Sequence, residues 1–429
     1  MLDDESRSVL VFFVKSLSPA RIRLALLALA LGGFGIGSTE FVVLGLLPNI
    51  ARDLLPALYA RSPELANAQA GWLASAYALG VVVGAPTIAA FAARFPRKKL
   101  LLVLAAAFTV GTVLSAVLPT FGLVFAARFI AGLPHGAYFG IASLVAASLM
   151  GPGKRGAGVA YVLSGLTIAN VIGVPAITFL GQQAGWRVAY FAVAVIFGLT
   201  FVALALLLPN QAGDATATMK RELRAFGRSQ VWLTLLTGAI GFGGFFAVYT
   251  FISPISTEVA GLPPVLVPIV LVMVGLGMTL GNAVGGWAAD RHVVRAIYSF
   301  FGLFIVSLAG LALTASTVPG LFVFVFLVGV AAAGISPAIQ TRLMDVAGDS
   351  QTLAAAANHS ALNIGNSLGA YLGGLTIAAG LGYVSPVWVG LLLCLPGVAL
   401  ITWSVLLQSH RGGTLDGSHR TSTVPLGAE

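Results

Sequence analysis

The stretch "LGVVVGAPTIAAFAARFPRKK", residues 79–99, aligns with "LGMTLGNAVGGWAADRHVVRA", residues 276–296, at an offset of 197 residues. A second pair, "TIANVIG" at 167–173 and "NIGNSLG" at 363–369, aligns at an offset of 196. The aligned residues are Gly80 and Gly277, Gly84 and Gly281, Arg94 and Arg291, Lys98 and Arg295, Asn170 and Asn366, and Gly173 and Gly369. Two independent matches at nearly the same offset indicate that the chain consists of two duplicated halves.

The composition identifies an integral membrane protein. The chain has 429 residues, of which 58% are hydrophobic and only 9% are charged, and its mean hydropathy is +0.98. A soluble domain carries roughly 25% charged residues. With so few charged residues the chain cannot cover a surface that faces water, so most of its surface must face lipid.

Twelve segments are long and apolar enough to cross a bilayer as helices, which needs about 20 residues each. They are expected at 22–50, 69–92, 99–118, 121–149, 156–182, 186–208, 231–256, 264–289, 293–316, 319–341, 352–380 and 384–408. We therefore predict an all-α membrane protein with an N-terminal six-helix bundle at 1–208 and a C-terminal bundle at 231–408. A polar cytoplasmic linker at 209–230 joins the two bundles, and a disordered cytoplasmic tail follows at 409–429.

The distribution of basic residues predicts the orientation in the membrane. With twelve spans, 19 of the 23 Lys and Arg residues lie on the side of the two termini, three lie on the other side, and Arg128 lies within a span. Basic residues are enriched in cytoplasmic loops. We therefore expect both termini in the cytoplasm. The many arginine and alanine residues of the chain suggest a bacterial source.

Several other classes of protein are disfavoured. The basic residues are spread over short loops, which argues against nucleic acid as a partner. The single cysteine, Cys394, lies in an apolar span, so neither a disulfide framework nor a thiol metal site is expected. The sequence contains no P-loop and no H-E-x-x-H metal motif. We expect no metal, no cofactor and no use of ATP, and we expect a monomer whose partners are lipid, protons and a small molecule.

Four stretches give the chain a resemblance to the major facilitator superfamily, in particular to its bacterial arabinose-efflux-like and chloramphenicol-resistance-like drug/proton antiporters. They are "GSTEFVVLGLLPNIARDL" (37–54), "RFIAGLPHG" (128–136), "GLTIANVIGVP" (165–175), which is followed by Gly181 and "GWR", and "GWAADRHVVR" (286–295). The resemblance covers nearly the whole chain and implies two pseudo-symmetric six-helix bundles around one central cavity. Transporters of this construction bind substrate near the membrane midplane, between the two halves.

The resemblance also implies a set of gating residues. The loop signature is the stretch at 286–295, and its degenerate first copy lies at 89–98; their gating residues are Arg94, Arg97, Lys98, Gly286, Asp290, Arg291 and Arg295. The antiporter motif is the stretch that begins at residue 165; its residues are Gly165, Gly173, Pro175 and Gly181. The first copy has alanine at positions 89 and 93, where the family carries glycine and aspartate, and a proline at 96 in place of the loop glycine. The acidic part of the cytoplasmic lock is therefore expected at Asp290 alone. The glycines, eight residues apart, are expected to allow close helix packing and to form a dry seam between the halves.

Two ionisable residues lie deep in their spans. Glu40 is about 18 Å and Arg128 about 13 Å from the outer end of its helix, at a rise of 1.5 Å per residue. Ionisable groups in the membrane interior are costly and are usually functional. We expect Glu40 to be the proton-coupling carboxylate and Arg128 to modulate its protonation, although a structural ion pair is the alternative. His135 lies on the same helical face as Arg128 and is either a proton relay or a packing residue.

Further polar and aromatic residues are expected to line the substrate cavity. Residues 359, 363 and 366 form a polar stripe that can bind substrate or join neighbouring helices. The expected cavity residues are Glu40, Arg128, Phe245, Phe246, Tyr249, His359, Asn363 and Asn366.

We expect a secondary active transporter that exports a small amphipathic drug, such as chloramphenicol, in exchange for protons. A sugar exporter of the arabinose type is the near alternative. A non-transporting receptor and an intramembrane enzyme are the alternatives from other classes.

Overall fold

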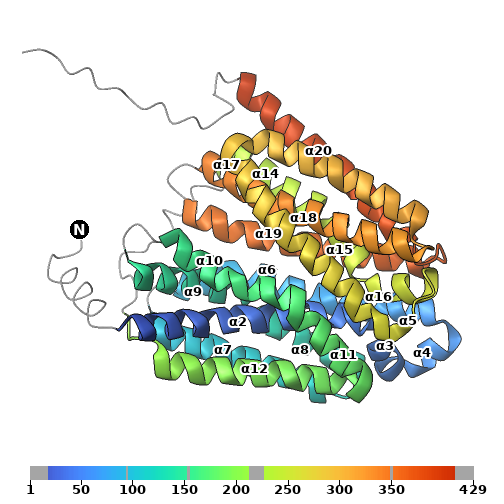
Figure 1. Cartoon of the computed structure of the whole chain (residues 1–429), viewed down its shortest axis with the longest axis horizontal. Coiled ribbons are helices and arrows are strands. Elements are labelled where there is room, and N and C mark those ends of the chain that lie inside the picture. The colour runs from blue at the N-terminus through green and yellow to red at the C-terminus, as the bar shows by residue number, and fades with distance from the viewer. Residues whose placement is uncertain (1–17, 93–94, 152–154, 212–226, 348–350, 411–429) are drawn as a thin grey trace, which may run out of the picture.

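The computed structural model describes residues 18–92, 95–151, 155–211, 227–347 and 351–410, and helices without strands make up this part of the chain. The N-terminal half consists of α2 (Pro19–Gly45), α3 (Leu47–Leu54), α4 (Pro56–Arg61), α5 (Pro63–Ala70), α6 (Trp72–Ala92), α7 (Arg97–Val117), α8 (Phe121–Gly132), α9 (His135–Met150), α10 (Arg155–Ile168), the π-helical turn η1 (Ala169–Gly173), α11 (Val174–Ala184) and α12 (Trp186–Leu207). The two halves lie side by side with their helices running in similar directions (Figure 1).

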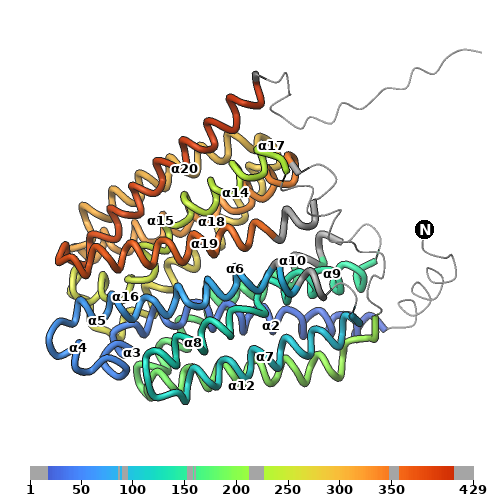
Figure 2. Tube along the Cα trace, turned by 180° about the vertical axis from the view of Figure 1, so that it is seen from behind, coloured from blue at the N-terminus to red at the C-terminus, as the bar shows by residue number. Residues whose placement is uncertain are grey.

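The C-terminal half consists of α14 (Ser229–Gly241), α15 (Gly243–Tyr249), α16 (Ile252–Pro254), η3 (Ile255–Val259), η4 (Pro264–Leu266), α17 (Val267–Thr314), α18 (Val318–Ala347), α19 (Gln351–Ala378) and α20 (Ser385–His410). Its helices are coloured yellow to red in the tube view, on one side of the blue and green N-terminal half (Figure 2).

The twelve predicted spans are confirmed as helical segments. Ten described segments are long and apolar enough to cross a membrane. One of them, Pro264–Thr314, is 51 residues long. It contains a kink at the non-helical residue His292, with φ −150° and ψ 85°, and α17 folds back on itself (Figure 1), so it supplies two spans. The twelfth helical segment is α19, which is not among these ten and packs against α6 and α15.

Prolines and short polar side chains mark many of the helix starts. Proline is the first residue of α2, α4 and α5, where its missing N–H leaves no intrahelical bond unmade. The hydroxyl of Ser62 accepts a hydrogen bond from the backbone N–H of Leu65 at 3.2 Å, and Thr120 does the same for Leu123. These caps satisfy N–H groups that the first turn of a helix leaves unpaired. Pro175 is the second residue of α11, just after η1, where its ring disturbs the regular helical hydrogen bonding.

The packing of the glycines repeats at the offset found in the sequence. A Cβ atom at Gly80 of α6 would collide with the backbone of Phe129 in α8, and one at Gly84 with the backbone of Leu133, just after α8. In the other half, Gly277 and Gly281 of α17 lie against the backbone of α18 in the same way, at Phe326 and Val330. The contacted residues are therefore also 197 positions apart, and the duplication extends to the helix interfaces.

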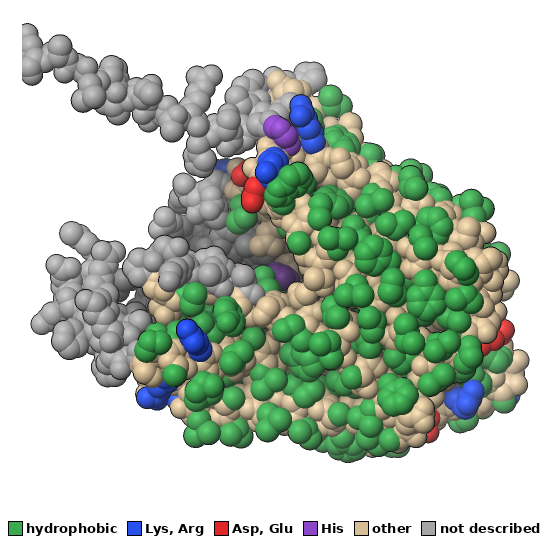
Figure 3. Space-filling model, in the orientation of Figure 1, with side chains coloured by type: hydrophobic (Ala, Val, Ile, Leu, Met, Phe, Trp, Pro, Cys, Tyr) green, Lys and Arg blue, Asp and Glu red, His purple; other side chains and the backbone are tan. Residues whose placement is uncertain are grey.

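The outer surface fits a lipid environment. Apolar side chains cover the visible face, and the charged side chains gather at its two ends (Figure 3). Large aliphatic residues are strongly exposed on this outer surface, including Leu206 at 69% and Leu313 at 74%. Since lipid tails solvate such side chains, their exposure carries no penalty in a bilayer. Helix α2 begins and α20 ends at the same end of the molecule (Figure 1), as an even number of spans requires.

The two halves touch at the end where α3, α4 and α5 lie. There the amide of Asn67 donates to the Tyr383 hydroxyl at 2.8 Å, and the amide of Gln182 donates to the Pro264 carbonyl at 2.9 Å. At the end where α2 begins, the surface is hollowed between the halves (Figure 3). The described residues of the two halves thus meet at one end and leave a hollow at the other (Figure 3).

Candidate transport site

Glu40 lies where helices from both halves meet. Its side chain on α2 is only 7% exposed. One carboxylate oxygen accepts a hydrogen bond from the Nδ2 amide of Asn366 on α19 at 3.4 Å. The other oxygen lies 3.9 Å from Nδ1 of His135 on α9. Three residues that the sequence analysis selected on separate spans are therefore brought together around one carboxylate.

Among the described acidic residues, Glu40 is the only buried one. The other five, Asp53, Glu64, Glu258, Asp290 and Asp345, are exposed. A buried carboxylate can bind and release a proton at a site that water does not fill, whereas the exposed ones are in contact with solvent or headgroups.

Arg128 is fully buried on α8 and lies close to Glu40 without an ion pair between them. Its guanidinium donates one hydrogen bond, from Nη1 to the hydroxyl of Thr39 at 3.1 Å. Its Cζ atom lies 4.5 Å from the ring centroid of Tyr77 and 5.6 Å from that of Tyr190. These rings stabilise the buried cation through cation–π interactions. The structural ion pair considered in the sequence analysis is therefore not formed in this conformation.

Tyr77 on α6 belongs to the site although no sequence pattern predicted it. Its side chain is fully buried, and its hydroxyl lies 3.1 Å from Nδ1 of His135. Tyr77 thereby connects the arginine with the histidine. A single tyrosine in an apolar span has no sequence signal that separates it from ordinary packing residues.

The predicted aromatic cavity residues form one cluster that joins the halves. Phe245, Phe246 and Tyr249 of α15 are all buried. Phe41, next to Glu40 on α2, lies 6.2 Å from Phe246 and 5.6 Å from Tyr249 between ring centroids. The hydroxyl of Tyr249 is buried and makes no hydrogen bond to a described residue.

The residues of the polar stripe on α19, His359, Asn363 and Asn366, make different contacts. Asn366 reaches Glu40, while the amide of Asn363 donates to the carbonyl of His359 in its own helix at 2.9 Å. The ring of His359 stacks on Phe139 of the N-terminal half, with centroids 6.1 Å apart. The side-chain oxygens of Asn363 and Asn366 are buried acceptors without a donor among the described residues. Such acceptors are available to a ligand.

The Cβ directions of the antiporter-motif glycines point toward helices of the N-terminal half, although η1 and α11, which contain two of these glycines, also pack against α17 of the other half. A Cβ atom at Gly165 would collide with the Ala30 carbonyl, while one at Gly173 would overlap the ring of Phe34. Both partners belong to α2 in the same half. Gly181 likewise faces Leu46, just after α2. The expected close packing is confirmed, because small residues allow close helix approach, but it joins helices within the N-terminal half.

The basic residues of the first loop signature contact the end of α12. The ammonium of Lys98 donates to the Leu208 carbonyl at 2.7 Å, where the helix terminus carries partial negative charge. The backbone N–H of Arg97 donates to the Gln211 carbonyl at 3.0 Å. Arg94 lies outside the described residues.

The second loop signature faces the surface. Asp290, Arg291 and Arg295 are exposed, and Asp290 makes no ion pair with a described residue. The Arg291 guanidinium lies 3.9 Å from the ring of Trp287, and a Cβ atom at Gly286 would meet nothing within 4 Å. In this conformation the expected lock at Asp290 is not engaged with any described basic residue.

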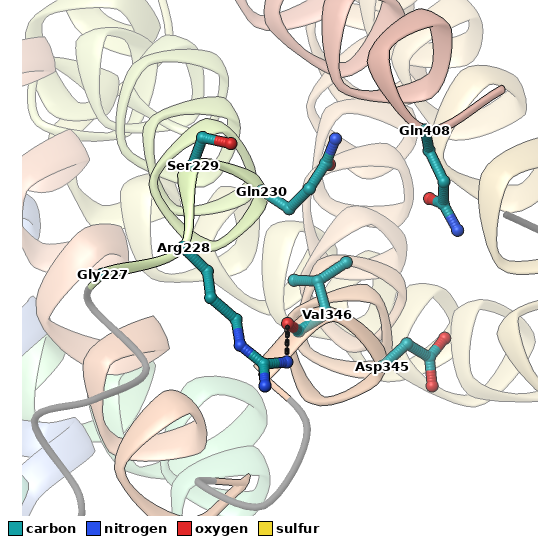
Figure 4. A pocket seen from close by; sticks show the side chains of 7 residues that line it. All are labelled: Gly227, Arg228, Ser229, Gln230, Asp345, Val346 and Gln408. Carbon is teal, nitrogen blue, oxygen red and sulfur yellow. Dashed lines mark hydrogen bonds between the residues drawn. The ribbon is translucent and has the colours of Figure 1, made fainter. Parts of the chain in front are cut away.

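A pocket at the end of the C-terminal half is distinct from this site. It has a volume of about 540 Å³, and side chains from α14, α18 and α20 surround it (Figure 4). Its lining residues are Gly227, Arg228, Ser229, Gln230, Asp345, Val346 and Gln408. The guanidinium of Arg228 donates to the Val346 carbonyl at 3.2 Å. None of the predicted site residues lines this pocket.

The chain is similar in sequence to known transport proteins. The family model of the Major Facilitator Superfamily matches residues 29–350 and 269–426. The inner membrane transport protein YdhP of Escherichia coli K12 is 40% identical over 85% of this chain and 91% of its own length. The putative transporter AraJ of the same organism is 32% identical over 83% of this chain and 89% of its own length. A chloramphenicol resistance protein of Streptomyces lividans is 32% identical over 90% of this chain and its entire length.

The fold is also similar to a solved structure. The crystal structure of a D-xylose–proton symporter superposes with a TM-score of 0.72, at 16% identity, over 89% of this chain and 97% of that one. At this level of identity the likeness concerns the fold alone.

Proposed function

The chain belongs to the major facilitator superfamily of membrane transporters, and from this premise we propose that it exports small amphipathic compounds in exchange for protons. The transporter class excludes the enzyme and receptor alternatives. We further propose that residues 1–208 and 231–408 are the two moving bundles, that 209–230 links them, and that a single chain is the working unit in a bacterial cytoplasmic membrane.

The burial of Glu40 between the halves supports proton coupling most directly. A carboxylate at this position contacts α9 of its own half and α19 of the other. A change in its protonation alters a hydrogen bond between the moving parts, and a coupling residue must have this property. One proton moved through 100 mV supplies about 2.3 kcal/mol, which is enough to bias a conformational equilibrium by more than tenfold.

The closed end and the hollow between the halves support alternating access. If the end with the termini is cytoplasmic, as the basic residues predict, this conformation is open to the cytoplasm. Substrate then enters from the hollow toward Glu40. The halves rock so that the contacts of Asn67 and Gln182 break. The outward-facing Glu40 takes up a proton as substrate leaves, and proton loss to the cytoplasm resets the cycle.

The aromatic cluster around Phe41 favours an apolar or amphipathic substrate. Rings of Phe41, Phe245, Phe246 and Tyr249 form one cluster that begins at the residue after Glu40 and offers aromatic surface for stacking. The name of the Streptomyces relative makes chloramphenicol a specific candidate. Sugar export remains the second candidate because the buried oxygens of Asn363 and Asn366 and the hydroxyl of Tyr249 can accept hydrogen bonds from substrate hydroxyls.

Export from cells at several external pH values tests this proposal. Cells that express the wild type, Glu40→Gln or Glu258→Gln at equal levels are loaded with chloramphenicol or with arabinose, and retained compound is measured. We expect export of chloramphenicol that rises with the proton gradient in the wild type and in Glu258→Gln, whose acid is exposed, but not in Glu40→Gln. Export of arabinose but not of chloramphenicol would indicate that the substrates are sugars. Unchanged pH dependence in Glu40→Gln would refute its coupling role.

A further inference from the structure

The hydroxyl of Tyr77 and the carboxylate of Glu40 both lie near the same ring nitrogen, Nδ1 of His135. Nδ1 of His135 lies 3.1 Å from the Tyr77 oxygen and 3.9 Å from the nearer Glu40 oxygen. The first distance is that of a hydrogen bond, and the second is too long for one. In this conformation His135 is therefore bonded to Tyr77 and lies next to the carboxylate.

The direction of this hydrogen bond follows from the needs of the Tyr77 hydroxyl. A buried O–H group that makes no hydrogen bond loses the free energy of its hydration, so it requires an acceptor. Within the described chain, Nδ1 of His135 is the acceptor within reach of the Tyr77 hydroxyl. Tyr77 thus donates, and the neutral ring of His135 carries its own proton on Nε2.

The lone pair of Nδ1 can accept one hydrogen bond at a time. Tyr77 occupies it while Glu40 is ionised, and ionised Glu40 instead accepts from Asn366. A protonated Glu40 is a donor and needs an acceptor of its own. Closing the 3.9 Å gap by about 1 Å would bring it to Nδ1, but only if Tyr77 releases that nitrogen.

We propose that Tyr77 is a positioning residue that competes with protonated Glu40 for Nδ1 of His135 and thereby sets the pH at which Glu40 gains and loses its proton. The inference rests on the proposed coupling role of Glu40. It gives His135 two hydrogen-bonding states, one with Tyr77 and ionised Glu40 and the other with protonated Glu40. The cation–π contact with Arg128 holds the Tyr77 ring in place while its hydroxyl releases Nδ1.

The ionisable groups around His135 come from four elements. Glu40 faces it from α2 and Tyr77 from α6, while Arg128 of α8 lies behind the Tyr77 ring. From α19, His359 approaches across Phe139, which contacts both histidine rings. His359 is the one that can itself titrate near neutral pH in water, so the test must separate its effect from that of Tyr77.

Infrared difference spectroscopy on the full chain in lipid tests the proposal without a substrate. The protonated carboxyl band that is present in the wild type and absent in Glu40→Gln is assigned to Glu40 and titrated with pH. In Tyr77→Phe the competitor is removed and the ring is kept. We expect the midpoint of this band to move upward by about one pH unit, the tenfold effect of one buried hydrogen bond.

Two controls distinguish the hydroxyl from general packing. Tyr190→Phe removes the hydroxyl of the other ring that faces Arg128 and should leave the midpoint unchanged. In a His135→Phe background, which lacks the contested nitrogen, Tyr77→Phe should add no shift. His359→Phe should leave the Tyr77→Phe shift intact.

The outcomes separate this inference from the proposed function. An unchanged or lowered midpoint in Tyr77→Phe, an equal shift in Tyr190→Phe, or a shift that persists without His135 would overturn the role of Tyr77 and leave that of Glu40 standing. If no titrating band disappears in Glu40→Gln, the coupling role of Glu40 fails, and the inference fails with it.

Discussion

The side-chain amide of Asn366 donates a hydrogen bond to the carboxylate of Glu40 across the boundary between the two halves, at 3.4 Å. The two residues are 326 positions apart in the chain and lie on α19 and α2. An ionised carboxylate accepts this bond readily, whereas a protonated one offers a weaker acceptor. The contact therefore ties the protonation of Glu40 to the relative position of the halves.

Replacing Asn366 by leucine should weaken coupling. The variant loses one long hydrogen bond, of about 1 kcal/mol, so we expect an approximately fivefold smaller substrate accumulation at a fixed pH gradient. Asn363→Leu is the matched control, because the amide of Asn363 bonds within its own helix. It should change the substrate concentration needed for half-maximal rate and not the pH dependence. Equal effects of both variants on the pH dependence would contradict the account.

Tyr383→Phe should open the end where α3, α4 and α5 lie. This change removes the acceptor of the buried hydrogen bond from Asn67 and should shift the conformational equilibrium by about fivefold, for about 1 kcal/mol. Spin labels at exposed positions Ala60 and Leu381, in a Cys394→Ser chain, report the separation of the halves. The variant should show a larger population at long distance.

Tyr371→Phe is the control for this measurement, since Tyr371 contacts Trp72 through its ring, which phenylalanine retains. A distance distribution that is the same in Tyr383→Phe and in the wild type would show that the Asn67 contact does not hold this end closed.

Gly277→Ala should destabilise the fold. Its new methyl group would collide with the Phe326 carbonyl, and overpacking of this kind costs about 1–3 kcal/mol. Gly302→Ala lies on the same helix, α17, with nothing within 4 Å of its Cβ position, and should be neutral or slightly stabilising. Because the single cysteine, Cys394, is buried, its reaction with a fluorogenic maleimide during heating reports unfolding directly. An unfolding temperature of Gly277→Ala equal to that of Gly302→Ala would argue against the close contact of α17 with α18.

The ion pair of Asp53 with Arg187 should make a small, pH-dependent contribution to stability. Partial burial raises the pKa of Asp53, but hydrogen bonds from Arg187 and Trp186 outweigh it and hold the pKa below its ordinary value. The contribution is therefore fully present above the ordinary carboxyl pKa of about 3.9 and is lost as the pH falls through the lowered value. Asp53 is 46% exposed, so solvent screening limits the contribution to less than about 1 kcal/mol.

Thermal unfolding of Asp53→Asn at two pH values measures this contribution. The variant should unfold at a slightly lower temperature than the wild type at pH 7, and the difference should become smaller as the pH falls below the ordinary carboxyl pKa of about 3.9. Glu64→Gln, at the same end of the molecule, is the control and should show no such trend. A difference that grows at low pH would contradict the assigned sign.

The sequence was sufficient to predict the helices and their duplication. Hydrophobic length located each span, and glycines at one offset predicted equivalent helix packing, which the contacts of Gly80 and Gly277 confirm. Depth along a helix, counted from residue numbers, predicted similar depths for Glu40 and Arg128, and Arg128 bonds Thr39, the residue before Glu40. What depth does not give is the rotation of each helix about its axis, so it could not show that Arg128 bonds Thr39 instead of Glu40.

The prediction missed Tyr77 and misjudged which helix the antiporter-motif glycines face, and both shortcomings have the same physical cause. Tyr77 lies in an apolar span without a motif, and only the packing of α6 against α8 and α9 brings its hydroxyl to His135. The glycines of α10, η1 and α11 were expected between the halves, yet they face α2, because spacing alone shows that a small-residue face exists and not which helix covers it. The partner of a helix face is a property of the assembled bundle.

Transport in liposomes tests the central claim, that Glu40 couples proton movement to substrate movement, most directly. Purified wild type and Glu40→Gln are reconstituted at equal density, and uptake of chloramphenicol is followed both as exchange with internal chloramphenicol and as net accumulation driven by an acidic interior. The account predicts that both proteins exchange the drug and that only the wild type accumulates it. Accumulation by Glu40→Gln equal to that of the wild type would show that the proton is carried elsewhere.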